Sequence, residues 1–169
     1  MVKSLLRTVD DFLDDELYNT CVLYSIETLN SGELNLKTNH SWDYGVVKDS
    51  PIVLIHKLTP ENELYMRINE SIQNNIGIYN VKLIQFYYWL PGSHIPWHDD
   101  TNHNGAITIY LNKNWSEDWG GIFLFKDENN INGIYPKSNM ALHLTSGIQH
   151  AVCPTTKSSD IRFTIQVFY

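Results

Sequence analysis

The first helix is predicted from apolar side chains that recur every three or four positions over residues 9–30, the spacing of one face of an α-helix. Asp10 or Asp11 precedes the first of these apolar residues and would cap the helix. The next segment, residues 31–50, is polar and rich in Asn, Ser and Gly. This segment is predicted to be a loop with room for one edge strand.

A second helix is predicted over residues 58–77. Thr59 would cap its start, Pro60 suits the first helical position, and Gly77 follows the last apolar residue. After Gly77 the period of the apolar positions changes to two, which is the period of a β-strand. The chain therefore places its helices first and its strands afterwards.

The strands are predicted from short runs of β-branched and aromatic residues that Gly, Asn and Pro separate. Helices followed by many closely spaced strands predict an α+β, mainly β chain, with a β-sandwich or jelly-roll barrel and helices packed outside. No repeat or linker divides the 169 residues. A single domain is expected, with helical support over about residues 1–77 and a β core over about residues 78–169. The predicted strands lie in residues 79–90, 105–112, 120–127, 139–145 and 161–169, and residues 127–139 are predicted to be an exposed loop.

Composition narrows the class of partner. The formal net charge of −7 weighs against nucleic acid, because binders of nucleic acid usually carry a basic surface. Cys21 and Cys153 are the only cysteines, which fits a reducing compartment better than a disulfide framework. The N-terminal residues lack the pattern of a signal peptide, and the longest aliphatic run, residues 52–55, is far shorter than the ~20 residues of a membrane span. A cytoplasmic protein with no membrane association is expected.

A His-x-Asp triplet, His98 to Asp100, is the first candidate for chemistry. Triplets of this kind arise by chance in a chain of this composition, and alone this one indicates a surface histidine beside two acids. In a strand, however, residues two apart project to the same side. His98 and Asp100 would then converge on one ion, whereas Asp99 would point away.

His150 follows a predicted strand and is the best placed third ligand. Two histidines and one carboxylate on one face of a metal leave three positions open, which is the arrangement of non-haem Fe(II) oxygenases. A closed tetrahedral zinc site would need a fourth ligand, which His94, His103 or Cys153 could supply. Cys153 lies three residues from His150, the wrong parity for a shared strand face, so we interpret it as a small buried hydrophobe.

The last predicted strand carries a charge in apolar surroundings. Arg162, Thr164 and Gln166 share one face of this strand, and apolar residues share the other. A guanidinium inside a barrel needs a partner, either an acid of the chain or a ligand carboxylate held through two hydrogen bonds. Tyr110 lies on the polar side of an earlier predicted strand and could share that carboxylate.

Taken together, these motifs resemble an Fe(II)/2-oxoglutarate-dependent dioxygenase of the prolyl-4-hydroxylase-like group. The resemblance covers about residues 81–169, in which His-x-Asp, Tyr-Leu-Asn, Gly-Gly, a distal His and an Arg follow in the order of the family. It implies a double-stranded β-helix (jelly-roll) core in which His98, Asp100 and His150 are the iron ligands. It also implies that Arg162 pairs with the distal carboxylate of 2-oxoglutarate.

The same resemblance gives Tyr110 a contact with the cosubstrate and implies another from an aromatic residue shortly before the iron histidine. Tyr87, Tyr88 and Trp89 compete for that position, and we select Tyr88. The implied reaction uses Fe(II), 2-oxoglutarate and O2, with ascorbate as reductant. It hydroxylates a peptide (prolyl-type) or a small molecule and releases succinate and CO2. The alternative is a jelly-roll binding module with a structural metal and no redox catalysis.

Overall fold

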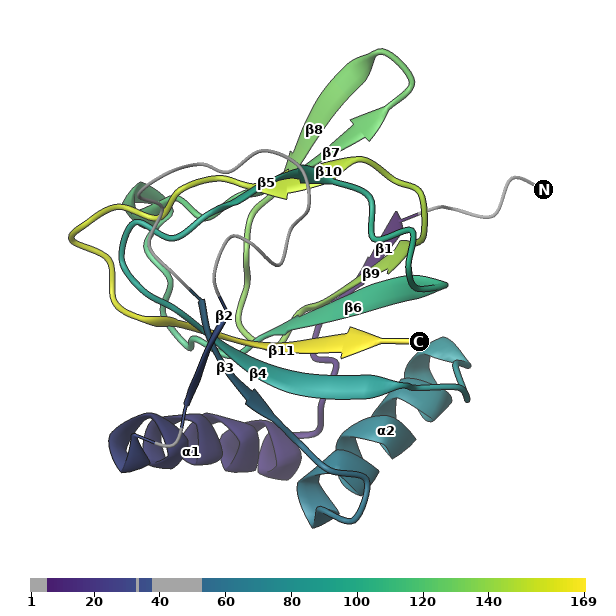
Figure 1. Ribbon diagram of the computed structural model, residues 1–169, viewed down its shortest axis with the longest axis vertical. Coiled ribbons are helices and arrows are strands. Elements are labelled where there is room, and N and C mark those ends of the chain that lie inside the picture. The colour runs from purple at the N-terminus through teal and green to yellow at the C-terminus, as the bar shows by residue number, and fades with distance from the viewer. Residues whose placement is uncertain (1–5, 33, 38–52) are drawn as a thin grey trace.

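The computed structural model describes residues 6–32, 34–37 and 53–169, which form two α-helices, a short 3₁₀ helix and strands β1 to β11 (Figure 1). The helices are α1 (Asp15–Ser31), α2 (Glu63–Ile76) and the 3₁₀ helix η2 (Glu117–Trp119). The strands are β1 (Leu6–Val9), β2 (Asn35–Lys37), β3 (Val53–Lys57), β4 (Leu83–Trp89), β5 (Ile95–His98), β6 (Gly105–Tyr110), β7 (Phe123–Asp127), β8 (Asn130–Ile134), β9 (Ala141–Thr145), β10 (His150–Val152) and β11 (Arg162–Phe168).

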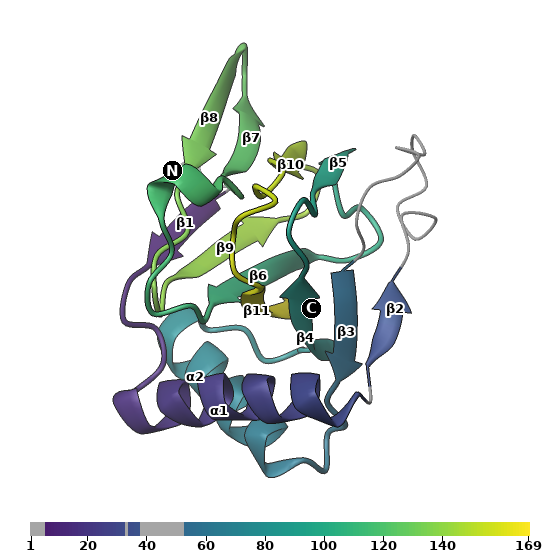
Figure 2. The ribbon, with the colours of Figure 1, turned by 90° about the vertical axis from the view of Figure 1, so that its left-hand side faces the viewer.

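The strands form two antiparallel sheets that face each other. The larger sheet has the order β1-β9-β6-β11-β4-β3-β2, and the smaller sheet has the order β5-β10-β7-β8. Both helices lie against the outer face of the larger sheet, and the smaller sheet lies on the opposite side (Figure 2). This arrangement confirms the prediction of a mainly β, α+β chain with a jelly-roll core and flanking helices.

The larger sheet has one apolar and one mixed face because side chains alternate along its strands. On β11, Ile165 and Val167 are fully buried in the apolar cluster that includes side chains of both helices. Arg162 and Gln166 project to the other side, where they line the space between the two sheets. The alternation predicted for the last strand is therefore confirmed.

The first helix begins later than predicted. α1 starts at Asp15, and its N-cap is Asp14, whose carboxylate accepts a hydrogen bond from Leu17 N at 2.8 Å. The predicted caps, Asp10 and Asp11, lie in the preceding turn instead. Asp11 has a left-handed backbone, with φ of 49°, which a right-handed helix cannot continue.

The second helix also begins later, at Glu63, with the side chain of Asn62 as its N-cap. The predicted cap was Thr59 with Pro60 in the first helical position, and both residues lie before the helix. Asparagine is a stronger N-cap than threonine, which explains the later start. The predicted end is confirmed, since Gly77 has the left-handed φ of 80° and caps the last turn.

Residues 127–139, predicted to be an exposed loop, contain strand β8. It pairs with β7 from Phe123↔Ile134 to Asp127↔Asn130, and the hairpin projects from the body of the molecule (Figures 1 and 2). The sequence signal was weak because β8 is an exposed edge strand whose Asn and Gly residues are typical of turns.

The predicted edge strand within residues 31–50 corresponds to β2, at one edge of the larger sheet. Residue 33 and residues 38–50 lie outside the described part of the chain. Within the described part, neither helix has the length and apolar content that crossing a membrane would require.

Stability is expected to fall between about pH 6.5 and pH 4 because of His143 on β9. Burial and the nearby charge of Arg7 lower the pKa of His143 to about 4, whereas the pKa of an unfolded histidine is about 6.5. Between these values the unfolded chain binds more protons, so the free energy of unfolding decreases as the pH falls. Urea unfolding of the metal-free protein should show a shallower pH dependence for His143→Gln over this range. An identical dependence in wild type and variant would contradict this assignment.

Candidate active site

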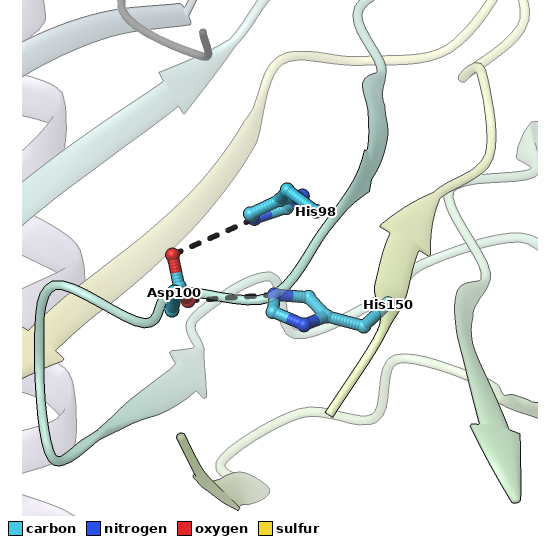
Figure 3. A group of neighbouring side chains, drawn as sticks. All are labelled: His98, Asp100 and His150. Carbon is cyan, nitrogen blue, oxygen red and sulfur yellow. Dashed lines mark ion pairs between the residues drawn. The ribbon is translucent and has the colours of Figure 1, made fainter. Parts of the chain in front are cut away.

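His98 and His150 lie on neighbouring strands of the smaller sheet and are directly opposite each other. His98 is the last residue of β5 and His150 the first of β10, and the two are paired in the antiparallel register. Their ring centroids are 4.1 Å apart. Adjacent strands therefore present both imidazoles to the same point between the sheets (Figure 3).

Each imidazole is oriented by a main-chain carbonyl. Nδ1 of His98 is 2.8 Å from the carbonyl oxygen of Pro96, and Nδ1 of His150 is 2.8 Å from that of Ile148. A carbonyl oxygen can only accept, so each Nδ1 carries the hydrogen and donates it. The lone pair of each Nε2 is then free to bind a metal, with the ring held by its outer hydrogen bond.

Asp100 supplies a carboxylate that faces both imidazoles (Figure 3). Its oxygens lie 3.7 Å from His98 Nε2 and 3.4 Å from His150 Nε2. Strand β5 has already ended at His98, and Asp100 has a left-handed backbone with φ of 50°. A turn, and not the alternation of a continuous strand, thus brings this carboxylate back toward the histidines.

The electrostatics of the three residues suit a divalent cation. Burial by itself raises the pKa of Asp100, but its interactions with the imidazoles of His150 and His98 outweigh burial, so the net pKa is below the usual value. Burial and the neighbouring His150 lower the pKa of His98. Near neutral pH the site therefore contains an ionised carboxylate beside a neutral His98.

The donor set fits Fe(II). Ligand atoms of His98, Asp100 and His150 all lie within 4.8 Å of one another, and they form the one such group of three or more found among the described residues. Two imidazole nitrogens and one carboxylate oxygen form the facial set that leaves three metal positions open. The fourth ligands considered for zinc, His94, His103 and Cys153, are not part of this group.

A cavity lies between the sheets beside this group. It extends from Arg162 at one end to Phe168 at the other, along the inner faces of β4, β6 and β11. Apolar side chains of both sheets limit contact with water around the three polar residues. Besides these, the cavity is lined by Tyr87, Trp89, Ile95, Thr108, Tyr110, Phe123, Val152 and Gln166.

Arg162 is a buried cation, 2% exposed, without an acidic partner among the described residues. Its Nη1 donates a hydrogen bond of 2.6 Å to the carbonyl oxygen of Gly121, and its Nε has no partner there. The guanidinium lies 4.7 Å from the ring centroid of Trp89 and 5.3 Å from that of Tyr110. Burial lowers the pKa of Arg162, because water no longer solvates the charge. An unpaired buried cation of this kind fits a ligand carboxylate.

Tyr110 faces the same end of the cavity, and its hydroxyl also has no partner among the described residues. Burial raises its pKa, so the hydroxyl stays protonated and can donate a hydrogen bond. Gly121 has to be glycine, because its φ is 71° and a Cβ atom would collide with Arg162 Nη1. Two free donors and a close main-chain approach therefore surround a space suited to one carboxylate.

The structure does not bring Tyr88 to the cavity, which corrects its selection as a cosubstrate contact. Tyr88 is fully buried on the outer face of β4 and packs edge-to-face on Phe163, with ring centroids 5.7 Å apart. Its neighbours Tyr87 and Trp89 point inward and line the cavity. Gln85, a polar residue in an otherwise apolar strand, was the available signal, since Tyr87 and Trp89 share its parity.

A row of polar side chains crosses the larger sheet, and of these the sequence had indicated only Gln166. Gln85, Gln166 and Thr108 lie side by side on β4, β11 and β6. Thr108 donates a hydrogen bond of 2.7 Å to Gln166 Oε1, and Tyr87 donates one of 3.4 Å to Gln85 Oε1. Thr108 and Gln166 line the cavity, and Gln85 is buried beside them in the sheet.

Comparison with known proteins agrees with this geometry. Residues 84–169 match the family model described as the 2OG-Fe(II) oxygenase superfamily. No curated protein matches the chain. Solved structures do match it at low sequence identity, and they establish the fold.

One similar structure is a Pseudomonas putida prolyl-4-hydroxylase, with a TM-score of 0.75 and 18% identity over 98% of this chain and 92% of that one. Another is a Trichoplax adhaerens prolyl hydroxylase in complex with a hypoxia inducible factor peptide fragment. It has a TM-score of 0.83 and 16% identity, and the match covers 99% of this chain and 84% of that one. The viral collagen prolyl hydroxylase of Paramecium Bursaria Chlorella virus-1 has a TM-score of 0.67 and 16% identity, and the match covers 98% of this chain and 95% of that one.

The family match covers just over half of the chain and contains every residue of the candidate metal group, together with Arg162. It sets aside the alternative of a binding module without redox catalysis. The cofactors of this superfamily, Fe(II) and 2-oxoglutarate with O2 as oxidant, agree with the donor set described above. The chain belongs to the 2OG-Fe(II) oxygenase superfamily and is an Fe(II)/2-oxoglutarate-dependent dioxygenase.

Proposed function

We propose that this dioxygenase hydroxylates a prolyl residue of a peptide, with His98, Asp100 and His150 as ligands of Fe(II). Arg162 holds the distal carboxylate of 2-oxoglutarate in the same proposal, and Tyr110 assists it. The observation that carries the proposal is the cavity itself, which joins an unpaired buried guanidinium to a group of two imidazoles and one carboxylate. The proposal also takes ascorbate as the reductant and the cytoplasm as the location.

Bound Fe(II) and 2-oxoglutarate supply the oxidising chemistry, in which one oxygen atom of O2 enters succinate and the other enters the substrate, with release of CO2. The chain supplies orientation and charge. The carbonyl oxygens of Pro96 and Ile148 hold the two imidazoles so that each Nε2 points inward. The carboxylate of Asp100 compensates part of the positive charge of the metal.

The other side chains of the cavity position the cosubstrate and exclude water. Arg162 and Tyr110 each present a donor to a carboxylate at their end of the cavity. Trp89 covers the guanidinium and is itself fixed by a hydrogen bond of 3.0 Å from its Nε1 to Thr164 Oγ1. Phe123 stacks on the imidazole of His150, with centroids 5.3 Å apart, and shields it from water. The cosubstrate is thus oriented before the substrate arrives.

Two observations support a peptide as the substrate. The side-chain amide of Gln166, on the cavity lining, can donate to a carbonyl oxygen, of which a peptide has one at every residue. The similar Trichoplax protein is described in complex with a peptide fragment. A small molecule is the second candidate, because the fold also matches an epimerase of nogalamycin biosynthesis, SnoN, with a TM-score of 0.71 and 8% identity.

The proposal predicts stoichiometric hydroxylation of proline-containing peptides. A peptide pool incubated with the protein, Fe(II), 2-oxoglutarate and ascorbate should contain products heavier by one oxygen atom, in amounts equal to the succinate formed. Mass spectrometry locates the modified residue, and the same peptides with proline replaced by alanine are the control. Succinate release that no peptide stimulates, together with products from a pool of small metabolites, would replace the peptide by a small molecule.

A further inference from the structure

Asp99 and Gln149 connect the two segments that carry the candidate metal ligands. Asp99 lies between His98 and Asp100, and Gln149 immediately precedes His150. Gln149 Nε2 donates a hydrogen bond of 3.2 Å to Asp99 Oδ2. We call this pair the Asp99–Gln149 clasp.

The clasp is reinforced at both ends. The second carboxylate oxygen of Asp99, Oδ1, accepts a hydrogen bond of 3.3 Å from Thr101 N, across the turn that contains Asp100. The main-chain oxygen of Asp99 accepts one of 3.1 Å from Gly147 N, and the main-chain oxygen of Gln149 accepts one of 2.9 Å from Lys126 N on β7. One carboxylate therefore joins the turn after β5 to the start of β10.

This connection matters because the sheet does not hold Asp100. Strand β5 ends at His98, so no strand pairing fixes the position of the turn that follows. Aspartate tolerates the left-handed backbone of Asp100 better than most residues other than glycine, but this conformation still needs support from its surroundings. A relaxed turn would move this carboxylate away from the imidazoles, whereas His98 and His150 would stay paired in the sheet.

We propose that the Asp99–Gln149 clasp positions Asp100 against His98 and His150 for metal binding. The inference rests on the proposed function, since it takes these three residues as the metal ligands. Asp99 and Gln149 are positioning residues, and neither belongs to the metal group. Outer partners of metal ligands typically contribute about 10- to 100-fold in metal affinity, which is the size of effect expected for the clasp.

The decisive variant is Gln149→Leu, which removes the donor but keeps the net charge and nearly the size of the side chain. Anaerobic titration with Fe(II) should show an affinity about 10-fold lower than that of the wild type. The melting temperature of the metal-free protein should change little, because Gln149 is only half-buried and the main-chain hydrogen bonds of the clasp remain. Gln73→Leu makes the same chemical change on α2, away from the site, and should bind Fe(II) as the wild type does.

A reciprocal exchange separates positioning from a general loss of packing. In Gln149→Glu two carboxylates face each other, and the hydrogen bond is lost. In the double variant Asp99→Asn with Gln149→Glu, the asparagine amide donates to the glutamate carboxylate, and the net charge equals that of the wild type. The double variant should recover most of the Fe(II) affinity that Gln149→Leu loses.

The outcomes are distinct. Wild-type affinity in Gln149→Leu, or no recovery in the double variant, would overturn the clasp while the metal site stands. Failure of the wild-type protein to bind Fe(II) would overturn the metal ligands of the proposed function, and the clasp with them. The clasp requires that Gln149→Leu lose Fe(II) affinity at an unchanged melting temperature and that the double variant recover most of this affinity.

Discussion

Asp100→Asn is expected to abolish 2-oxoglutarate-dependent succinate release and to weaken Fe(II) binding by more than about 100-fold. The loss should exceed this value because removing a residue that only supports a metal ligand already costs up to about 100-fold in affinity. Asparagine keeps the size of the side chain and tolerates the left-handed backbone, so the turn should stay in place. It removes the negative charge that faces two imidazoles at 3.4 and 3.7 Å. Succinate can be measured by mass spectrometry, and Fe(II) affinity by anaerobic titration.

The same change one residue earlier is the control. Asp99→Asn keeps an oxygen that can accept the hydrogen bond from Gln149, gives up the acceptor used by Thr101 N, and removes no residue of the metal group. It should therefore cost far less in Fe(II) affinity than Asp100→Asn. Equal losses in the two variants would mean that the site responds to local charge in general, and Asp100 would no longer be assigned as a ligand.

Arg162→Leu is expected to weaken 2-oxoglutarate binding by about 100-fold or more while Fe(II) affinity stays close to that of the wild type. Charge-assisted hydrogen bonds contribute about 1.5–3 kcal/mol each, so the loss of two corresponds to at least that factor. The metal-free protein should lose little stability. Leucine removes a buried charge that has no acidic partner in the described residues, which offsets the lost hydrogen bond to Gly121 O.

Two measurements check the role of Arg162. Anaerobic titration of the Fe(II) protein gives the 2-oxoglutarate affinity directly, and thermal unfolding with and without 2-oxoglutarate gives the stabilisation by binding. At 100 times the dissociation constant, the ligand should stabilise the wild type by about 2.7 kcal/mol, whereas the same concentration should barely stabilise the variant. Arg67→Leu, which removes an exposed ion pair with Glu16 on the helical side, is the matched control. An unchanged 2-oxoglutarate affinity in Arg162→Leu would assign the anchor to another residue.

The sequence predicted the sheet faces well because successive side chains of a strand point to opposite sides, and here one side packs in the apolar core while the other borders a cavity with polar residues. In β11 every second residue is apolar and packs under the helices, so the polar positions had to face the interior between the sheets. Arg162 was conspicuous for the same reason, since a charge in such a strand requires a partner. The helix starts were less predictable, because several neighbouring residues could serve as N-cap and the structure uses Asp14 and Asn62.

The prediction that Asp100 lies beside His98 was correct, but the strand alternation behind it is only part of the reason. Strand alternation predicted that His98 and Asp100 converge, and the structure brings them together. The strand, however, ends at His98, and a left-handed turn redirects the next residues. A single positive φ angle depends on hydrogen bonds such as that from Gln149 to Asp99, which join residues about fifty positions apart. Local sequence patterns contain no such information.

Tyr88 shows the limit of choosing among adjacent aromatic residues. The sequence offers three in a row, and resemblance alone does not distinguish their parity. The register does, because Trp89 lies opposite Arg162 and Tyr87 opposite Thr164. The same pairing places Tyr88 opposite Phe163, which explains why it packs in the core.

The backbone of Asp100 also bears on how this site could change during evolution. Glycine adopts a φ of 50° without strain, so Asp100→Gly would remove the carboxylate and leave the turn intact. Alanine would remove the carboxylate as well, but its Cβ atom would keep the backbone strained. Aspartate and glycine codons differ by a single base. A metal centre that keeps only two imidazoles and an open position for an external anion is therefore one nucleotide change away from this sequence.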